Sequence, residues 1–121
     1  MSGKKYYVYI LCNRKNGLLY IGFTYDIRKR TIEHKEGKYD SFTKKYRIDK
    51  LVYFEEFFDK KEAVIREQRL KKWKREWKIE LIEKQNPKWK DLFGYLPKKL
   101  SGIEILDSLF RGNKLICDFE N

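Results

Sequence analysis

The sequence predicts an α+β domain with a small central antiparallel three-stranded sheet flanked by helices, in the order ββαβαα, and a C-terminal extension. Residues 6–12 and 18–24 alternate in polarity and are rich in Tyr, Val and Ile, which is typical of strands. The chain then changes between helical spacing and one further strand-like run. A length of 121 residues suits one domain, which we place at 1–92, with an extension of unknown role at 93–121.

The first two strands are predicted to form a hairpin. Asn16-Gly17 lies between them, and both residues tolerate the positive φ of a tight turn. A turn centred there would place Tyr9 opposite Thr24 and Leu11 opposite Gly22. Tyr9 and Tyr20 then share one face of the sheet. A glycine inside a strand, such as Gly22, often marks the close approach of another group.

A helix and a third strand are predicted next. Asp26 is a suitable N-cap for a helix over Ile27–Glu36, and Gly37 is a suitable stop. Residues 48–58 are strand-like because they combine β-branched and aromatic side chains.

Two more helices follow. Asp59 and Glu62 have capping-box spacing and predict a helix that runs through Trp73. A further helix over Trp77–Glu83 ends before Asn86-Pro87, since the residue before proline disfavours the helical region. In the tail, the sequence favours a short helix from Ser101 to Phe110, capped by Ser101 and Glu104, and an edge strand over 115–119.

The net charge indicates a polyanionic partner. The chain has 29 Lys and Arg against 18 Asp and Glu, a net charge of +11. Residues 101–121 carry two bases and four acids, so residues 1–100 carry 27 and 14, a net charge of +13. We expect nucleic acid first and an acidic membrane surface second. No apolar run is long enough to span a bilayer, and the N-terminus lacks a secretory pattern.

Cysteine usage predicts a cytoplasmic protein. Cys12 and Cys117 are far apart and lie in strand-like surroundings. We therefore expect reduced packing residues, not a disulfide or a zinc site. The single histidine, His34, also argues against a His-based zinc site.

Two polar residues lie on the inward stripe of the first helix. At 100° per residue, Arg30 and His34 share a face with Ile27 and Thr31. A functional pair would explain this pattern. The structural alternative is an arginine whose head group reaches solvent and a histidine bonded to a backbone carbonyl.

The second helix places a carboxylate inward. Ala63, Glu67 and Leu70 follow the i, i+4, i+7 spacing. A carboxylate there must be paired, hydrogen-bonded or metal-bound, because an unpaired buried charge costs several kcal/mol. The structural alternative is an ion pair with one of the many Lys or Arg residues, Arg30 included. Two phenols, Arg30, His34 and Glu67 could thus converge on one sheet face.

A basic stretch with tryptophans covers residues 69–78. It holds six bases against one acid, Glu76, and Trp73 and Trp77 are one turn apart. We interpret the tryptophans as mainly structural and the charges as a phosphate-binding surface. The bases expected to contact nucleic acid are Arg28, Arg69, Lys71, Lys72, Lys74, Arg75 and Lys78.

These residues together resemble the GIY-YIG nuclease superfamily, in particular stand-alone single-domain proteins similar to the nuclease domain of the excision-repair endonuclease. Tyr7-Val8-Tyr9 stands at the first motif triplet, where only Tyr9 matches, and Tyr20-Ile21-Gly22 matches the second. Arg30, His34 and Glu67 follow in the family's order. The resemblance covers roughly residues 5–92 and includes the stretch from Arg66 to Ile79.

The resemblance implies phosphodiester hydrolysis with a single Mg²⁺ or Mn²⁺. Glu67 would hold the metal, and Arg30 would stabilise charge on the phosphate in the transition state. Tyr9 would act as the general base or its close partner, which requires positive charge nearby to lower a phenol pKa that is ordinarily near 10. Tyr20 would position phosphate or water, and His34 would bond the phosphate or a tyrosine.

Three hypotheses follow from the sequence. The first is a metal-dependent endonuclease, a hydrolase that acts on DNA in preference to RNA and functions in DNA repair. The second is a non-catalytic nucleic-acid-binding module that uses the same basic face. The third, an adaptor at a membrane surface or on a protein, rests on charge alone, and we expect no membrane association. The sequence leaves strandedness, sequence preference and oligomeric state open.

Overall fold

The fold is built on one three-stranded antiparallel sheet, which confirms the predicted α+β class. The computed structural model describes residues 4–96. The strands lie in the order β2-β1-β3, so β1 is bonded on both sides. The bounds of the elements are β1 Tyr6–Cys12, β2 Leu19–Thr24, α1 Ile27–Lys35, α2 Ser41–Tyr46, β3 Lys50–Phe57, α3 Lys60–Lys72, α4 Arg75–Gln85 and the 3-10 helix η1 Leu92–Tyr95.

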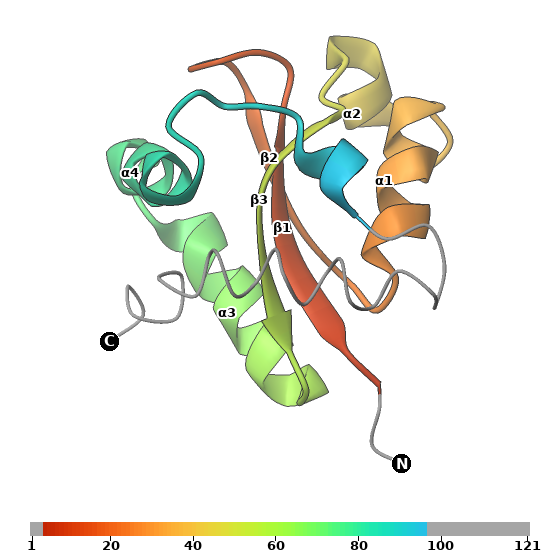
Figure 1. Cartoon of the computed structure of the whole chain (residues 1–121), viewed down its shortest axis with the longest axis vertical. Helices are drawn as coiled ribbons and strands as arrows, with labels where there is room; N and C mark the ends of the chain where they lie inside the picture. The colour runs from red at the N-terminus through yellow and green to blue at the C-terminus, as the bar shows by residue number, and fades with distance from the viewer. Residues whose placement is uncertain (1–3, 97–121) are drawn as a thin grey trace.

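Helices cover both faces of the sheet (Figure 1). The even-numbered residues of β1, such as Val8 and Ile10, pack in one cluster with Ala63 and Leu70 of α3 and with residues of α4. The odd-numbered residues, such as Tyr9, pack on the other face with residues of α1 and η1 and with neighbouring loops. This alternation, which follows from the strand period of two, separates the two cores.

The hairpin register differs from the predicted one by two residues. Tyr9 lies opposite Gly22 and not opposite Thr24. The connection is wider than a two-residue turn, because the side chain of Asn13 accepts a bond from Leu18 N at 2.8 Å. A shift of two residues leaves every side chain on its face, so the prediction that Tyr9 and Tyr20 share a face is confirmed.

Helix α1 agrees closely with its prediction. The carboxylate of Asp26 accepts a bond from Lys29 N at 3.0 Å, which caps the first turn. Gly37 has φ +70° and its N–H donates to the carbonyl of His34, as expected of a glycine that ends a helix.

The six-residue helix α2 was not predicted from the sequence. Asp40 caps it by accepting bonds from Phe42 N and Thr43 N, and Arg47 ends it in the left-handed region with φ 56°. Thr43 is the only residue of α2 that is buried. So short a helix gives no apolar periodicity, and its position depends on these caps and on the contacts of Thr43.

Helices α3 and α4 occupy the predicted regions with two differences. The side chain of Asp59 makes no capping bond, so the predicted capping box with Glu62 is wrong. Helix α4 begins at Arg75, two residues before the predicted start, and ends at Gln85, before Pro87 as expected.

Three remaining predictions concern the cysteines, the tail and the membrane. Cys12 is a buried free thiol, and burial raises its pKa to about 11. Cys117, the short helix expected from Ser101 and the edge strand at 115–119 lie outside the described residues. Within residues 4–96, no helix has both the length and the apolar character needed to cross a membrane.

Candidate active site

The centre of the candidate site is a hydrogen bond between Tyr9 of β1 and His34 of α1. The Oη of Tyr9 and the Nε2 of His34 are 3.1 Å apart, and both side chains are buried. The other ring nitrogen of His34, Nδ1, lies 3.0 Å from the hydroxyl oxygen of Thr43 in α2. His34 therefore joins the central strand to α2.

The direction of these bonds follows from Thr43. Its hydroxyl donates to the carbonyl oxygen of Asp40 at 3.0 Å, and a hydroxyl has only one hydrogen. Toward His34 the same oxygen must therefore accept, which places the imidazole hydrogen on Nδ1. Nε2 is then the acceptor for the Tyr9 hydroxyl. The chain runs from Tyr9 through His34 and Thr43 to the backbone of Asp40.

Gly22 explains how the Tyr9 ring reaches this position. It lies directly opposite Tyr9 on β2, where the phenol crosses over its backbone. A Cβ atom at Gly22 would lie 2.4 Å from both Cζ and Oη of Tyr9. The expectation that Gly22 marks a close approach is therefore confirmed, and the approaching group is the Tyr9 phenol.

Aromatic rings surround His34. The ring centroid of Tyr20 is 5.2 Å from that of His34, and the centroid of Tyr39 is 4.9 Å away, both in edge-on arrangements. Burial, and after it the positive charge of Arg30, lower the pKa of His34 from 6.5 to about 4. The imidazole is thus neutral at pH 7, as an acceptor for the Tyr9 proton must be.

The phenol pKa values differ from the expectation. Burial raises the pKa of Tyr20 to about 12. The pKa of Tyr9 is raised well above 10, mainly by burial and next by the neighbouring Tyr20 hydroxyl. Arg30 acts in the opposite direction but does not offset burial. Arg30 thus lowers the pKa of Tyr9 as expected, but burial outweighs it and the net pKa is raised in the protein without substrate or metal. Tyr9 is a neutral hydrogen-bond donor.

Arg30 lies at the border between this cluster and solvent. Its Nε donates to Glu33 at 3.1 Å and its Nη1 donates to the carbonyl of Phe23 at 3.4 Å. Its guanidinium also covers the ring of Tyr39 at 3.9 Å from the centroid. With 21% of its side chain exposed, Arg30 is fixed by these contacts and still accessible to an anion.

Glu67 does not lie on the same face of the sheet as the other four residues. It belongs to α3, which packs against the face opposite Tyr9, so the predicted convergence on one face is wrong (Figure 1). Its charge raises the pKa of Tyr20 as the smallest of several contributions, after burial. Glu67 is thus near enough to the edge strand β2 to act on Tyr20.

The carboxylate of Glu67 already carries a cationic partner. The Nζ of Lys71 lies 2.8 Å from its Oε2, while only 16% of the Glu67 side chain is exposed. The structural alternative of an ion pair is therefore confirmed, with Lys71 and not Arg30 as the partner. Residues 4–96 contain no group of three or more His, Cys, Asp or Glu arranged around a metal. A single carboxylate with a cation beside it still fits Mg²⁺, which commonly takes one or two carboxylates together with water and phosphate oxygens.

The basic residues of α3 and α4 have varied surroundings. Arg75 donates to the carbonyls of Asn16 and Gly17 and so fastens α4 to the hairpin turn. Lys78 is half-buried, which lowers its pKa, and Arg75 lowers it further. Of the other predicted bases, Arg28 covers the ring of Phe93, and the rest are exposed: Arg69, Lys71, Lys72 and Lys74.

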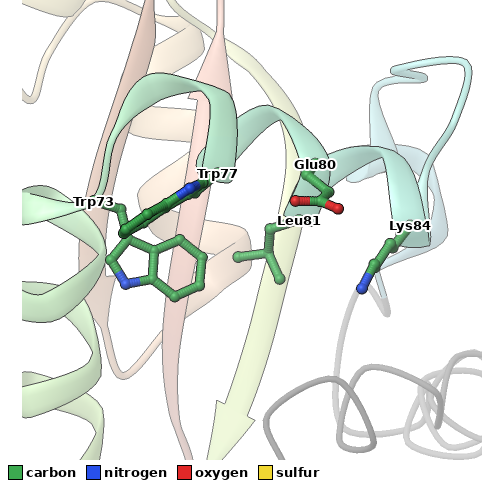
Figure 2. Close-up of a pocket in the computed structure, with 5 residues that line it drawn as sticks. All are labelled: Trp73, Trp77, Glu80, Leu81 and Lys84. Carbon is green, nitrogen blue, oxygen red and sulfur yellow. The ribbon is translucent and has the colours of Figure 1, made fainter.

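The two tryptophans line a shallow groove of about 230 Å³ beside α4. Figure 2 shows Trp73 and Trp77 next to one another, with Leu81 and Lys84 farther along the helix. Trp73 packs partly against the core, as the structural interpretation requires. Trp77 is 48% exposed, so that interpretation does not extend to it.

Thr43 and Tyr39 are site residues that the sequence patterns did not indicate. Asp40 with Thr43 three residues later is an N-cap pattern, which could have revealed α2. Nothing in the sequence indicates that Thr43 meets a histidine on another helix. Tyr39 lies in the loop before α2, where no periodicity marks a face.

Comparison with known proteins identifies the family of this chain. Residues 5–80 match the family described as the GIY-YIG catalytic domain. A UPF0213 protein of Staphylococcus saprophyticus is 44% identical over 78 residues, which is 64% of this chain and 94% of that protein. A UPF0213 protein of Syntrophus aciditrophicus is 46% identical over 85 residues, 69% of this chain and 94% of that protein. The solution NMR structure of a UPF0213 protein from Bacillus halodurans is 31% identical, with a TM-score of 0.47, and covers 72% of this chain and 92% of that chain. Because the family match covers more than half of the chain, the protein belongs to the GIY-YIG family, which is a nuclease family.

Proposed function

We propose that the protein is a divalent-metal-dependent endonuclease that hydrolyses phosphodiester bonds of nucleic acid, with DNA favoured over RNA. The observation that carries this proposal is the buried chain from Tyr9 through His34 to Thr43. It directs a phenol proton toward a neutral imidazole beside an accessible arginine.

In the proposed reaction, the proton moves in one direction along this chain. A water molecule attacks phosphorus and gives its proton to Oη of Tyr9, while Tyr9 gives its own proton to Nε2 of His34. The bond from phosphorus to the leaving oxygen breaks as the new bond forms, the leaving oxygen takes a proton from solvent water, and His34 returns its proton to solvent through Tyr9 after the product leaves. Tyr9 stays neutral throughout, so its raised pKa is no obstacle.

Arg30 connects substrate binding to this proton transfer. Its positive charge is one of the two main causes that keep the imidazole of His34 neutral. An anionic phosphate bound by Arg30 would offset that charge and so raise the pKa of His34. The histidine therefore becomes a better proton acceptor when substrate is present. The same contact stabilises charge on the phosphate in the transition state.

Glu67 is the residue that would hold the metal. A bound Mg²⁺ or Mn²⁺ would supply positive charge to the phosphate and the leaving oxygen. Tyr20 belongs to the edge strand β2, with its ring centroid 6.4 Å from that of Tyr9, and it would position the attacked phosphate or the water. The predicted basic residues would contribute affinity through phosphate contacts without sequence preference.

A cleavage assay tests the proposal. Purified protein is incubated with Mg²⁺ or Mn²⁺ and end-labelled single-stranded, duplex and branched DNA. We expect cleavage by the wild type and by Glu62→Gln, an exposed carboxylate of the same helix that serves as the matched control. Glu67→Gln should abolish cleavage while keeping the thermal stability of the fold. Unchanged cleavage by Glu67→Gln, or binding of DNA with no cleavage of any substrate by the wild type, would reject the proposal in favour of a binding module.

A further inference from the structure

Helix α2 and the loop before it expose three aromatic rings. The side chains of Tyr39, Phe42 and Tyr46 are 44%, 46% and 41% exposed, within eight residues of the chain. The rings of Phe42 and Tyr46 contact each other at a centroid distance of 5.1 Å. Tyr39 packs against His34, but the only buried residue of α2 among those described is Thr43, so the core does not account for Phe42 and Tyr46. We call Tyr39, Phe42 and Tyr46 the α2 aromatic surface.

Cations accompany this surface. Lys44, Lys45 and Arg47 are exposed, and the Nζ of Lys45 lies 5.3 Å from the ring centroid of Tyr46. The one acid within the same stretch, Asp40, uses its carboxylate to cap α2. Rings alternating with cations complement a ligand that has flat π-faces joined by anionic groups. An apolar protein partner would not require the cations.

The α2 aromatic surface is continuous with the candidate active site. Tyr39 contacts His34 at 4.9 Å between centroids and lies under the guanidinium of Arg30 at 3.9 Å. Thr43, on the same short helix, bonds His34. A nucleotide whose phosphate contacts Arg30 would therefore have its neighbouring base beside α2.

We propose that the α2 aromatic surface binds unpaired nucleobases next to the scissile phosphate, so that the substrate is nucleic acid with a single-stranded segment. Stacking on Phe42 or Tyr46 requires a base with a free face. The bases of an intact duplex are covered by their neighbours and offer no such face. This inference rests on the proposed function for the position of the phosphate, and it adds the class of substrate.

Binding without metal tests this inference separately from cleavage. The probe is a fluorescein-labelled oligothymidylate, and its affinity is measured by fluorescence anisotropy in EDTA. We expect Phe42→Ala and Tyr46→Ala each to weaken binding by about 5- to 150-fold, and Phe42→Tyr to restore it because the ring is kept. The matched control is Phe58→Ala, an exposed phenylalanine immediately after β3, and this variant should bind as the wild type does.

Further arms distinguish the alternatives. The same strand annealed to oligodeoxyadenylate should bind the wild type and both alanine variants with similar affinity. The inference would be overturned if the alanine variants lost affinity equally for the single strand and for the duplex. It would also be overturned if both alanine variants bound oligothymidylate with wild-type affinity. A shift from dimer to monomer in the alanine variants, seen by light scattering, would instead assign the surface to a second copy of the chain. Metal-dependent cleavage that persists beside any of these results would leave the proposed function intact.

Discussion

Replacing Gly22 by alanine tests the geometry of the site most directly. The added methyl carbon would lie 2.4 Å from Cζ and Oη of Tyr9, whereas ordinary contacts begin at 3.4 Å. The Tyr9 phenol must therefore move by about 1 Å, because the new methyl group is attached to the backbone of β2, which is held in the sheet. The Tyr9 to His34 bond is 3.1 Å long, and a displacement of that size along its direction either breaks it or forces the two atoms into a clash.

The expected loss of stability is moderate. Overpacking a filled site costs about 1–3 kcal/mol, and replacing a glycine within a strand returns about 0.5–1 kcal/mol. The net loss for Gly22→Ala is therefore centred on about 1 kcal/mol and does not exceed about 2.5 kcal/mol, and a loss of 1 kcal/mol lowers the Tm by about 4–8 °C in a domain near this size. The variant should remain folded at 25 °C.

The expected loss of activity is larger than the loss of stability suggests. Misplacing a reacting group by about 1 Å costs about 100-fold in rate. Single-turnover cleavage below the Tm of the variant measures this effect. A second measurement, the ¹⁵N NMR shift of Nε2 in His34, reports the broken bond with Tyr9 without depending on cleavage.

Gly94 provides the matched control. A Cβ atom there would meet nothing within 4 Å, so Gly94→Ala should retain the rate, the NMR shift and the Tm of the wild type. Wild-type values of rate and shift in Gly22→Ala would refute the claim that Gly22 positions the Tyr9 phenol.

Three further predictions concern charge and proton position. The pKa of His34 is about 4 in the folded protein and 6.5 in the unfolded chain, so the unfolded state binds more protons between these values and stability falls as the pH decreases through this window. Urea unfolding between pH 7 and pH 4 should show the wild type losing about 3 kcal/mol more than His34→Gln, and parallel curves of stability against pH would contradict this prediction. Thr43→Val removes the oxygen that accepts the hydrogen bond from Nδ1 of His34. We expect NMR to show a changed tautomer population of His34 and the cleavage rate to fall about 10-fold, and Thr43→Ser should restore both. A wild-type ¹⁵N pattern of His34 in the valine variant would show that Thr43 does not set the tautomer. Arg66 donates to both oxygens of buried Glu55, so Arg66→Met should destabilise the fold by about 3–5 kcal/mol in denaturant unfolding, and a loss below about 1 kcal/mol would mean that Glu55 is neutralised in another way.

Local patterns predicted the parts of the site that depend on one element or one turn. The period of two placed Tyr9 and Tyr20 on one face, and the helical period placed Arg30 and His34 on the inward stripe. The register was wrong by two residues because the Asn13 side chain widens the loop. An error of that size leaves the faces unchanged, so the shared face of Tyr9 and Tyr20 was still predictable.

The remaining parts depend on contacts between distant segments. The sequence pattern indicates that Glu67 points inward, but the connection from β3 to α3 decides which face of the sheet it approaches. Thr43 has a role only because α2 packs beside α1, and a six-residue helix gives no periodic signal. The raised pKa of Tyr9 follows chiefly from its burial among side chains of other elements, which no spacing along the chain reveals.

The position of Tyr9 in the central strand also determines how the site moves. Because β1 is bonded on both sides, its amide hydrogens exchange with solvent only when the sheet itself opens. Helix α2 buries a single side chain of its own and can open by itself at much lower free energy. The path from Tyr9 to Thr43 thus joins a strand whose amide hydrogens exchange slowly to a helix whose amide hydrogens exchange faster. The rate at which α2 opens sets how often His34 loses Thr43, the residue that fixes its tautomer.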